Sequence, residues 1–171
     1  MDGQQKSQDL TTSTPTVVKL KLPTNQYKIT SGYRDKSRVW NWHYDESKNL
    51  WINTKNKDGY GEHKGYDFLC PSGSPIRACV TGRILQVGWE NPKNEKQGFG
   101  YRIIQEFKRD GEKWLLYYGH LSLSYMATSG DEAETGQIIA NSGNTGHSTG
   151  AHLHVELRNY SNQQPHEIRW L

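Results

Sequence analysis

The chain has 171 residues, which is enough for one domain with its own core plus a tail and too few for two such domains. Hydrophobic residues make up 33% of the chain, with 10 Tyr, 6 Trp and 17 Gly, a mixture typical of a turn-rich β domain. The net charge of +3 favours an anionic partner, but no Lys/Arg cluster forms a known nucleic-acid motif, so nucleic-acid binding is not expected. No apolar run is long enough to span a bilayer, and no apolar leader follows Met1.

The first part of the chain divides into a polar tail and an irregular, aromatic-rich segment. Residues 1–16 are rich in Gln, Ser and Thr, and we interpret them as a flexible tail or linker before a domain over 17–171. Apolar and charged residues alternate over 17–22 and predict an edge strand that ends at Pro23. Residues 35–62 contain three of the six tryptophans in no regular pattern. They are expected to be either a loop packed under its own aromatic residues or a wall of a substrate groove.

From residue 63 onward the pattern is one of short strands separated by turns. Residues 63–70 are predicted to form a strand, and a further strand region over 76–89 is interrupted at Gly82. Asp110-Gly111 has the composition of a tight hairpin turn. No segment has a helical period of useful length. Strands at this spacing predict an all-β domain built on an antiparallel sheet that folds over on itself.

The two cysteines, Cys70 and Cys79, form no CxxC pair, and their spacing does not support a thiolate metal site. Both lie in apolar runs, so we expect two buried free thiols in preference to a disulfide. A metal site in this chain would then use imidazole and carboxylate ligands.

Two histidines stand two residues apart in the strand-like run His152-Leu153-His154-Val155-Glu156. Successive side chains of a strand point to opposite faces, so both imidazoles lie on one face while Leu153 and Val155 pack on the other. Two neutral imidazoles side by side usually serve a cation, or a proton transfer beside one. Glu156 lies on the His154 face, where it either orients a metal ligand or forms a plain salt bridge.

His63 and Asp67 are four residues apart, an even spacing that puts both side chains on one face of a strand. Catalytic zinc commonly takes three ligands from His and carboxylate side chains and leaves a fourth position for water. His63, Asp67 and one histidine of the HLH pair would complete that set, although a surface hydrogen bond explains the first two residues when they are taken alone. His120 stands at the end of an apolar strand. It is either a core histidine that is bonded to backbone or, if a metal lies nearby, a general base or transition-state stabiliser.

Together these segments resemble the lysostaphin-type zinc metalloendopeptidases, whose signature is an HxGxD segment followed by a later HxH. The resemblance covers roughly residues 29–158 and rests on the segments His63-Lys64-Gly65-Tyr66-Asp67, Tyr118-Gly119-His120 and His152-Leu153-His154, with Gly32-Tyr33-Arg34 and Ser142-Gly143-Asn144-Thr145-Gly146 alongside. It implies one Zn²⁺ ion held by His63, Asp67 and His154, with His120 and His152 as the catalytic pair. It also implies an antiparallel folded sheet of the barrel-sandwich type, with long loops forming a groove.

The resemblance further implies an enzyme that hydrolyses a peptide bond in the stem or cross-bridge of bacterial peptidoglycan. The sequence does not identify the oligomeric state, for which a monomer is the expectation. Such an enzyme acts on the cell wall, and it would be secreted or delivered with a phage particle. One alternative is a metal-free peptidoglycan-binding or amidase-activating module of the same fold, and another is a structural zinc site, which normally has four protein ligands. All five expected site positions are filled, which favours the enzyme. Glycyl-glycine bridges and links involving D-alanine or a diamino acid are both open as substrates.

Overall fold

The computed structural model describes residues 18–25, 28–34, 41–45, 50–54, 63–125 and 127–171, so the expected tail over 1–16 lies outside the described residues. The described residues contain strands and turns and no helix, as expected, and hence no helix that could cross a membrane. The strands are β1 (Val18–Leu20), β2 (Ile29–Ser31), β3 (Asn41–Asp45), β4 (Leu50–Thr54), β5 (Tyr66–Leu69), β6 (Pro75–Arg77), β7 (Gly82–Trp89), β8 (Tyr101–Arg109), β9 (Glu112–Gly119), β10 (Leu121–Tyr125), β11 (Glu132–Ala133), β12 (Ile138–Ser142), β13 (His152–Asn159), β14 (Pro165–His166) and β15 (Ile168–Trp170).

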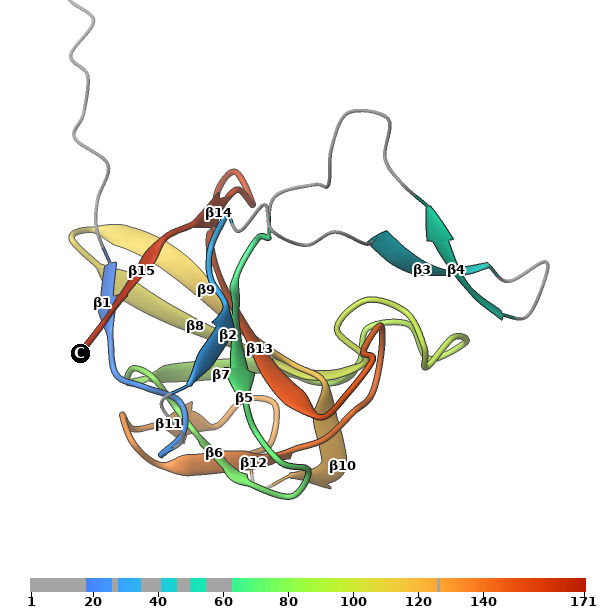
Figure 1. Ribbon diagram of the computed structural model, residues 1–171. Helices are drawn as coiled ribbons and strands as arrows, with labels where there is room; N and C mark the ends of the chain where they lie inside the picture. Colours follow the sequence, from blue (N-terminus) through green and yellow to red (C-terminus); the bar gives the residue numbers. More distant parts are fainter. Residues whose placement is uncertain (1–17, 26–27, 35–40, 46–49, 55–62, 126) are drawn as a thin grey trace, which may run out of the picture.

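The main sheet is antiparallel throughout and has the order β11-β7-β8-β9-β13-β5-β2, with β14 paired to β13 (Figure 1). A second, three-stranded sheet has the order β10-β12-β6, and β1 pairs in parallel with β15. Side chains from both larger sheets meet in one hydrophobic core, to which Trp114 and Leu116 contribute from β9 and Ile139 from β12. The predicted antiparallel sheet folded over on itself is therefore confirmed.

Strand β13 lies in the middle of the main sheet and separates the core from the opposite face. Leu153, Val155 and Leu157 have 0% of their surface exposed and belong to the core. The alternate residues His154 and Glu156 leave the sheet on the other side, as the period of two requires. A slip of one residue in the register would exchange these two sets, so burial of the three aliphatic side chains fixes the position of the imidazole.

Several local predictions are also confirmed. β1 lies within the edge strand expected over 17–22 and covers its residues 18–20, and β7 begins at Gly82, the predicted interruption. Asp110 and Gly111 have φ angles of 52° and 80°, the positive values that a two-residue hairpin turn between β8 and β9 needs. Both cysteines are buried and free. Burial raises the pKa of the Cys79 thiol to about 12, so this side chain is an unreactive part of the core.

Two expectations need correction. The segment 35–62, expected to be irregular, contains the antiparallel strands β3 and β4, drawn apart from the main sheet in Figure 1. Both runs contain aromatic residues, and β4 adds the β-branched Ile52 and Thr54, a composition that favours strand but stands among many polar neighbours. The groove-wall interpretation stays a prediction. The strand predicted over 63–70 begins only at Tyr66, so His63 precedes the strand. Between them, Gly65 lies so close to the Val155 carbonyl that no side chain would fit there.

Candidate metal centre

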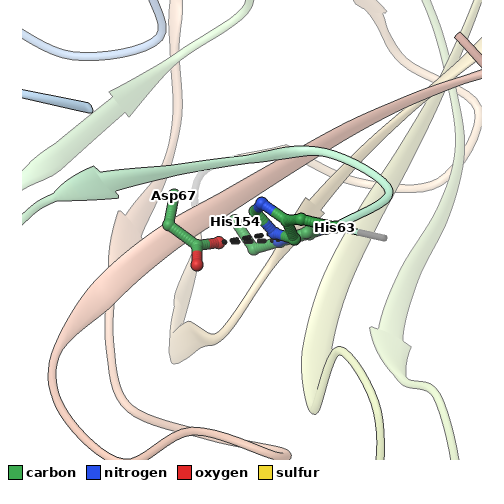
Figure 2. Close-up of side chains that lie close together, drawn as sticks. All are labelled: His63, Asp67 and His154. Carbon is green, nitrogen blue, oxygen red and sulfur yellow. Dashed lines mark hydrogen bonds and ion pairs between the residues drawn. The ribbon is translucent and has the colours of Figure 1, made fainter. Parts of the chain in front are cut away.

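Three buried side chains converge on the side of β5 and β13 that lies opposite the core (Figure 2). Asp67 stands opposite His154 in the antiparallel register, so the two side chains leave the sheet on the same face. His63 reaches the same point from the segment before β5. His154 Nδ1 lies 2.8 Å from Asp67 Oδ1 and 3.1 Å from His63 Nε2, and His63 Nε2 lies 3.3 Å from Asp67 Oδ1.

The donor set fits a divalent ion with tetrahedral coordination. Zinc bonds of about 2.0–2.1 Å to nitrogen and oxygen place the ligand atoms of a tetrahedron about 3.3 Å apart. The three observed distances lie close to that edge length. Among the described residues these three side chains form the group that can hold a metal ion, and all three are buried. Three protein ligands leave one tetrahedral position for water or substrate.

The second ring nitrogen of His63 is also bound. His63 Nδ1 donates to the carbonyl of Gly32 at 3.0 Å, because a carbonyl only accepts, and the Ser31 hydroxyl also lies 3.0 Å away. With the proton on Nδ1, the Nε2 lone pair points into the cluster, as a metal ligand requires. The backbone is tied in as well, since Arg34 N donates to the His63 carbonyl at 2.7 Å.

Charges around the centre favour an ionised carboxylate. Burial alone would raise the pKa of Asp67, but the hydrogen bond from His154 and the charge of that ring hold it well below its ordinary value. Burial alone would lower the pKa of His154, whereas its hydrogen bonds to Asp67 and Glu156 and their charges raise it above the ordinary value. The carboxylates thus bring negative charge to a point where two imidazole nitrogens converge, which attracts a cation.

His120 and His152 lie beside the cluster, with ring centroids 4.5 Å apart. His120 Nδ1 donates to the carbonyl of Thr145 at 2.7 Å, and His152 Nδ1 donates to the carbonyl of Gly150 at 2.8 Å. A neutral ring that donates from Nδ1 keeps an unprotonated Nε2, and that atom of His152 lies 3.7 Å from Asp67 Oδ1. Burial and the nearby charges of His152 and His154 lower the pKa of His120 to about 3, so the His120 ring is neutral at physiological pH.

Comparison with known families agrees with this geometry. The family model described as peptidase family M23 matches residues 61–166, which include all five histidine and aspartate positions described above. The chain belongs to peptidase family M23. The resemblance inferred from the sequence is thereby confirmed at the level of the family.

Relatives of this M23 chain include two curated staphylococcal proteins. Lysostaphin from Staphylococcus simulans is 36% identical over 126 residues, which cover 66% of this chain and 24% of that protein. Glycyl-glycine endopeptidase ALE-1 from Staphylococcus capitis is 37% identical over 118 residues, 62% of this chain and 30% of that protein. The match thus spans less than a third of either relative. The solved catalytic domain of the S. simulans lysostaphin peptidase has a TM-score of 0.60 and 31% identity, covering 84% of this chain and 90% of that one.

All five site residues expected of an M23 domain come together in space. Their positions on strand ends and turns follow from the sequence, but their neighbours do not. The three backbone carbonyls that bind the second imidazole nitrogens, and the ring of Phe99 that lies 5.3 Å from the His154 ring, carry no sequence signal of their own. Arg158 is likewise a missed contact, bound to Glu156 at 2.6 Å; only its position two residues further along the His154 face could have indicated it.

Proposed function

We propose that this M23 domain is a zinc-dependent endopeptidase that hydrolyses a peptide bond in bacterial peptidoglycan. His63, Asp67 and His154 would hold one Zn²⁺ ion, and His120 and His152 would act on protons beside it. The observation that carries the proposal is the close approach of three donor atoms next to two imidazoles that keep an unprotonated Nε2. The names of the relatives support the substrate class, since one is a glycyl-glycine endopeptidase.

The chain's own side chains can perform the proton transfers of hydrolysis. A bound zinc ion would supply polarisation of the scissile carbonyl and a lowered pKa for water. The Nε2 atom of His120 or His152 can take the proton from the water whose oxygen attacks the carbonyl carbon. The same imidazolium can return the proton to the amine nitrogen as the carbon–nitrogen bond breaks. Before that return, the Nε2–H of this imidazolium can donate to the oxyanion that forms between the two steps.

The proposal places the protein at the cell wall, whether it arrives by secretion or with a phage particle. Its test is digestion of purified walls that differ in cross-bridge chemistry, with the new amino termini identified by mass spectrometry. We expect amino termini from one class of bond, loss of release after chelation, and recovery with Zn²⁺. Co-sedimentation with walls and no release from any of them would instead identify a binding module. If the protein shows no binding and no release, both functions are refuted.

A further inference from the structure

The two ring nitrogens of His154 have different carboxylate partners. Nδ1 faces Asp67 and His63 in the cluster, and Nε2 lies 3.4 Å from Glu156 Oε2. A neutral imidazole carries one proton, so a ring that offers the Nδ1 lone pair to a metal must carry its proton on Nε2. On this side of the ring that proton faces the carboxylate of Glu156, an acceptor that an imidazole N–H can bind. The contact therefore selects the tautomer that a metal needs.

Glu156 is built into this position rather than placed there by chance. Only 2% of its surface is exposed, and an isolated carboxylate at such a site would be costly. Arg158 Nε donates to Glu156 Oε1 at 2.6 Å and supplies the compensating charge. The two carboxylate oxygens are thus divided, Oε1 binding the Arg158 guanidinium and Oε2 facing His154 Nε2.

Two aromatic side chains connect Arg158 back to His154 through ring contacts. The guanidinium carbon of Arg158 lies 4.6 Å from the ring centroid of Tyr117, which stacks on Phe99 with centroids 5.3 Å apart. The Phe99 ring in turn meets the His154 ring edge-on at 5.3 Å. Gly119, opposite His154 in the register, leaves space for Phe99, because a Cβ there would lie 2.7 Å from Phe99 Cδ1. The imidazole is held by packing as well as by hydrogen bonds.

We propose that Glu156 is a positioning residue, which holds His154 in the Nδ1-ligating tautomer and orientation while Arg158 holds Glu156. This inference rests on the proposed metal site. It differs from a plain structural salt bridge between Glu156 and Arg158, which would stabilise the fold and leave metal binding unchanged. Carboxylates behind a ligating histidine typically contribute roughly 10–100-fold to metal affinity, and we expect a loss of this size when the charge is removed.

The test is the dissociation constant for Zn²⁺ of the full chain, measured by competition with a chromogenic chelator. Glu156→Gln keeps the shape and removes the charge, and Glu132→Gln, at the exposed residue of β11, is the matched control. We expect Glu156→Gln to bind Zn²⁺ roughly 10–100-fold more weakly, with the control equal to the parent chain. Thermal unfolding in excess chelator should give nearly the same midpoint for all three proteins, since the metal-free fold retains the core.

The outcomes separate this inference from the proposed function. If the parent chain binds no Zn²⁺, the proposed metal site fails and the inference with it. If the parent chain binds Zn²⁺ and Glu156→Gln binds it within twofold, only the positioning role is overturned, and a lower metal-free midpoint would then identify a structural ion pair. Arg158→Gln provides a second variant should Glu156→Gln not fold. It should weaken Zn²⁺ binding in the same direction, and an unchanged constant would likewise overturn the inference.

Discussion

A methyl group at Gly65 should disrupt the metal centre directly. A Cβ at this position would lie 2.3 Å from the Val155 carbonyl oxygen and 2.9 Å from two atoms of the His154 ring. Relieving the carbonyl contact to 3.0 Å requires a displacement of 3.0 − 2.3 = 0.7 Å in strand β13, which the main-sheet ladder resists. Overpacking of this kind costs roughly 1–3 kcal/mol. For a domain of this size the cost lowers the unfolding midpoint by about 2–12 °C.

The same displacement moves a proposed ligand, and a misplacement of about 1 Å can cost on the order of 100-fold in function. We therefore expect Gly65→Ala to lose Zn²⁺ affinity by at least about tenfold as well as stability. Chelator competition measures the first quantity, and circular dichroism during heating measures the second. Lys64→Ala is the control, because Lys64 is the exposed neighbour in the same segment. A Gly65→Ala protein with unchanged affinity and midpoint would refute the close approach on which this reasoning depends.

Three further predictions concern the proposed roles of the centre. Asp67→Ala should lose Zn²⁺ binding and wall hydrolysis together, measured by metal content after gel filtration and by release of amino groups; retention of either would remove Asp67 from the ligand set. His120→Ala should keep Zn²⁺ and lose at least about 100-fold in hydrolysis rate, the usual contribution of a general acid or base, and full activity would exclude the proton role. Zn²⁺ affinity should weaken as the pH falls, starting above the ordinary imidazole pKa of about 6.5, because the raised pKa of His154 keeps a proton on the ring that competes with the ion; titration calorimetry at several pH values checks the sign.

Much of the site could be predicted because strand periodicity converts spacing into direction. The HLH run puts two imidazoles on one face and Leu153 in the core, and the structure has both arrangements. For Asp67 the same rule holds, since it lies on β5. For His63 the rule predicts a position near Asp67, which is correct, but it assumes that His63 lies in the strand, which is wrong. His63 precedes the strand, and the segment from Ser31 to Arg34 positions it by hydrogen bonds.

The supporting contacts could not be predicted because they depend on backbone and distant chain segments. Any residue has a carbonyl, so nothing in the sequence marks Gly32, Thr145 or Gly150 as the acceptors that orient three imidazoles. Phe99 lies 55 positions before His154 (154 − 99 = 55), in a loop that only the folded sheet brings against the ring. Its place depends on Gly119, whose lack of a side chain is meaningful only once β9 and β13 are paired.

Asp67 and His154 are held more rigidly than His63, the third proposed ligand. This difference determines which structural changes can disturb the centre. Asp67 and His154 face each other across paired strands whose opposite faces are buried, so moving either side chain disturbs the core. His63 belongs to no strand, and its hydrogen bonds run to Gly32 and Arg34. Changes that displace the backbone of that segment should therefore act on the centre without unfolding the sheet, whereas substitutions in the core behind β13 act on both. The paired strands thus fix two of the three proposed ligands, and hydrogen bonds to a neighbouring segment hold the third.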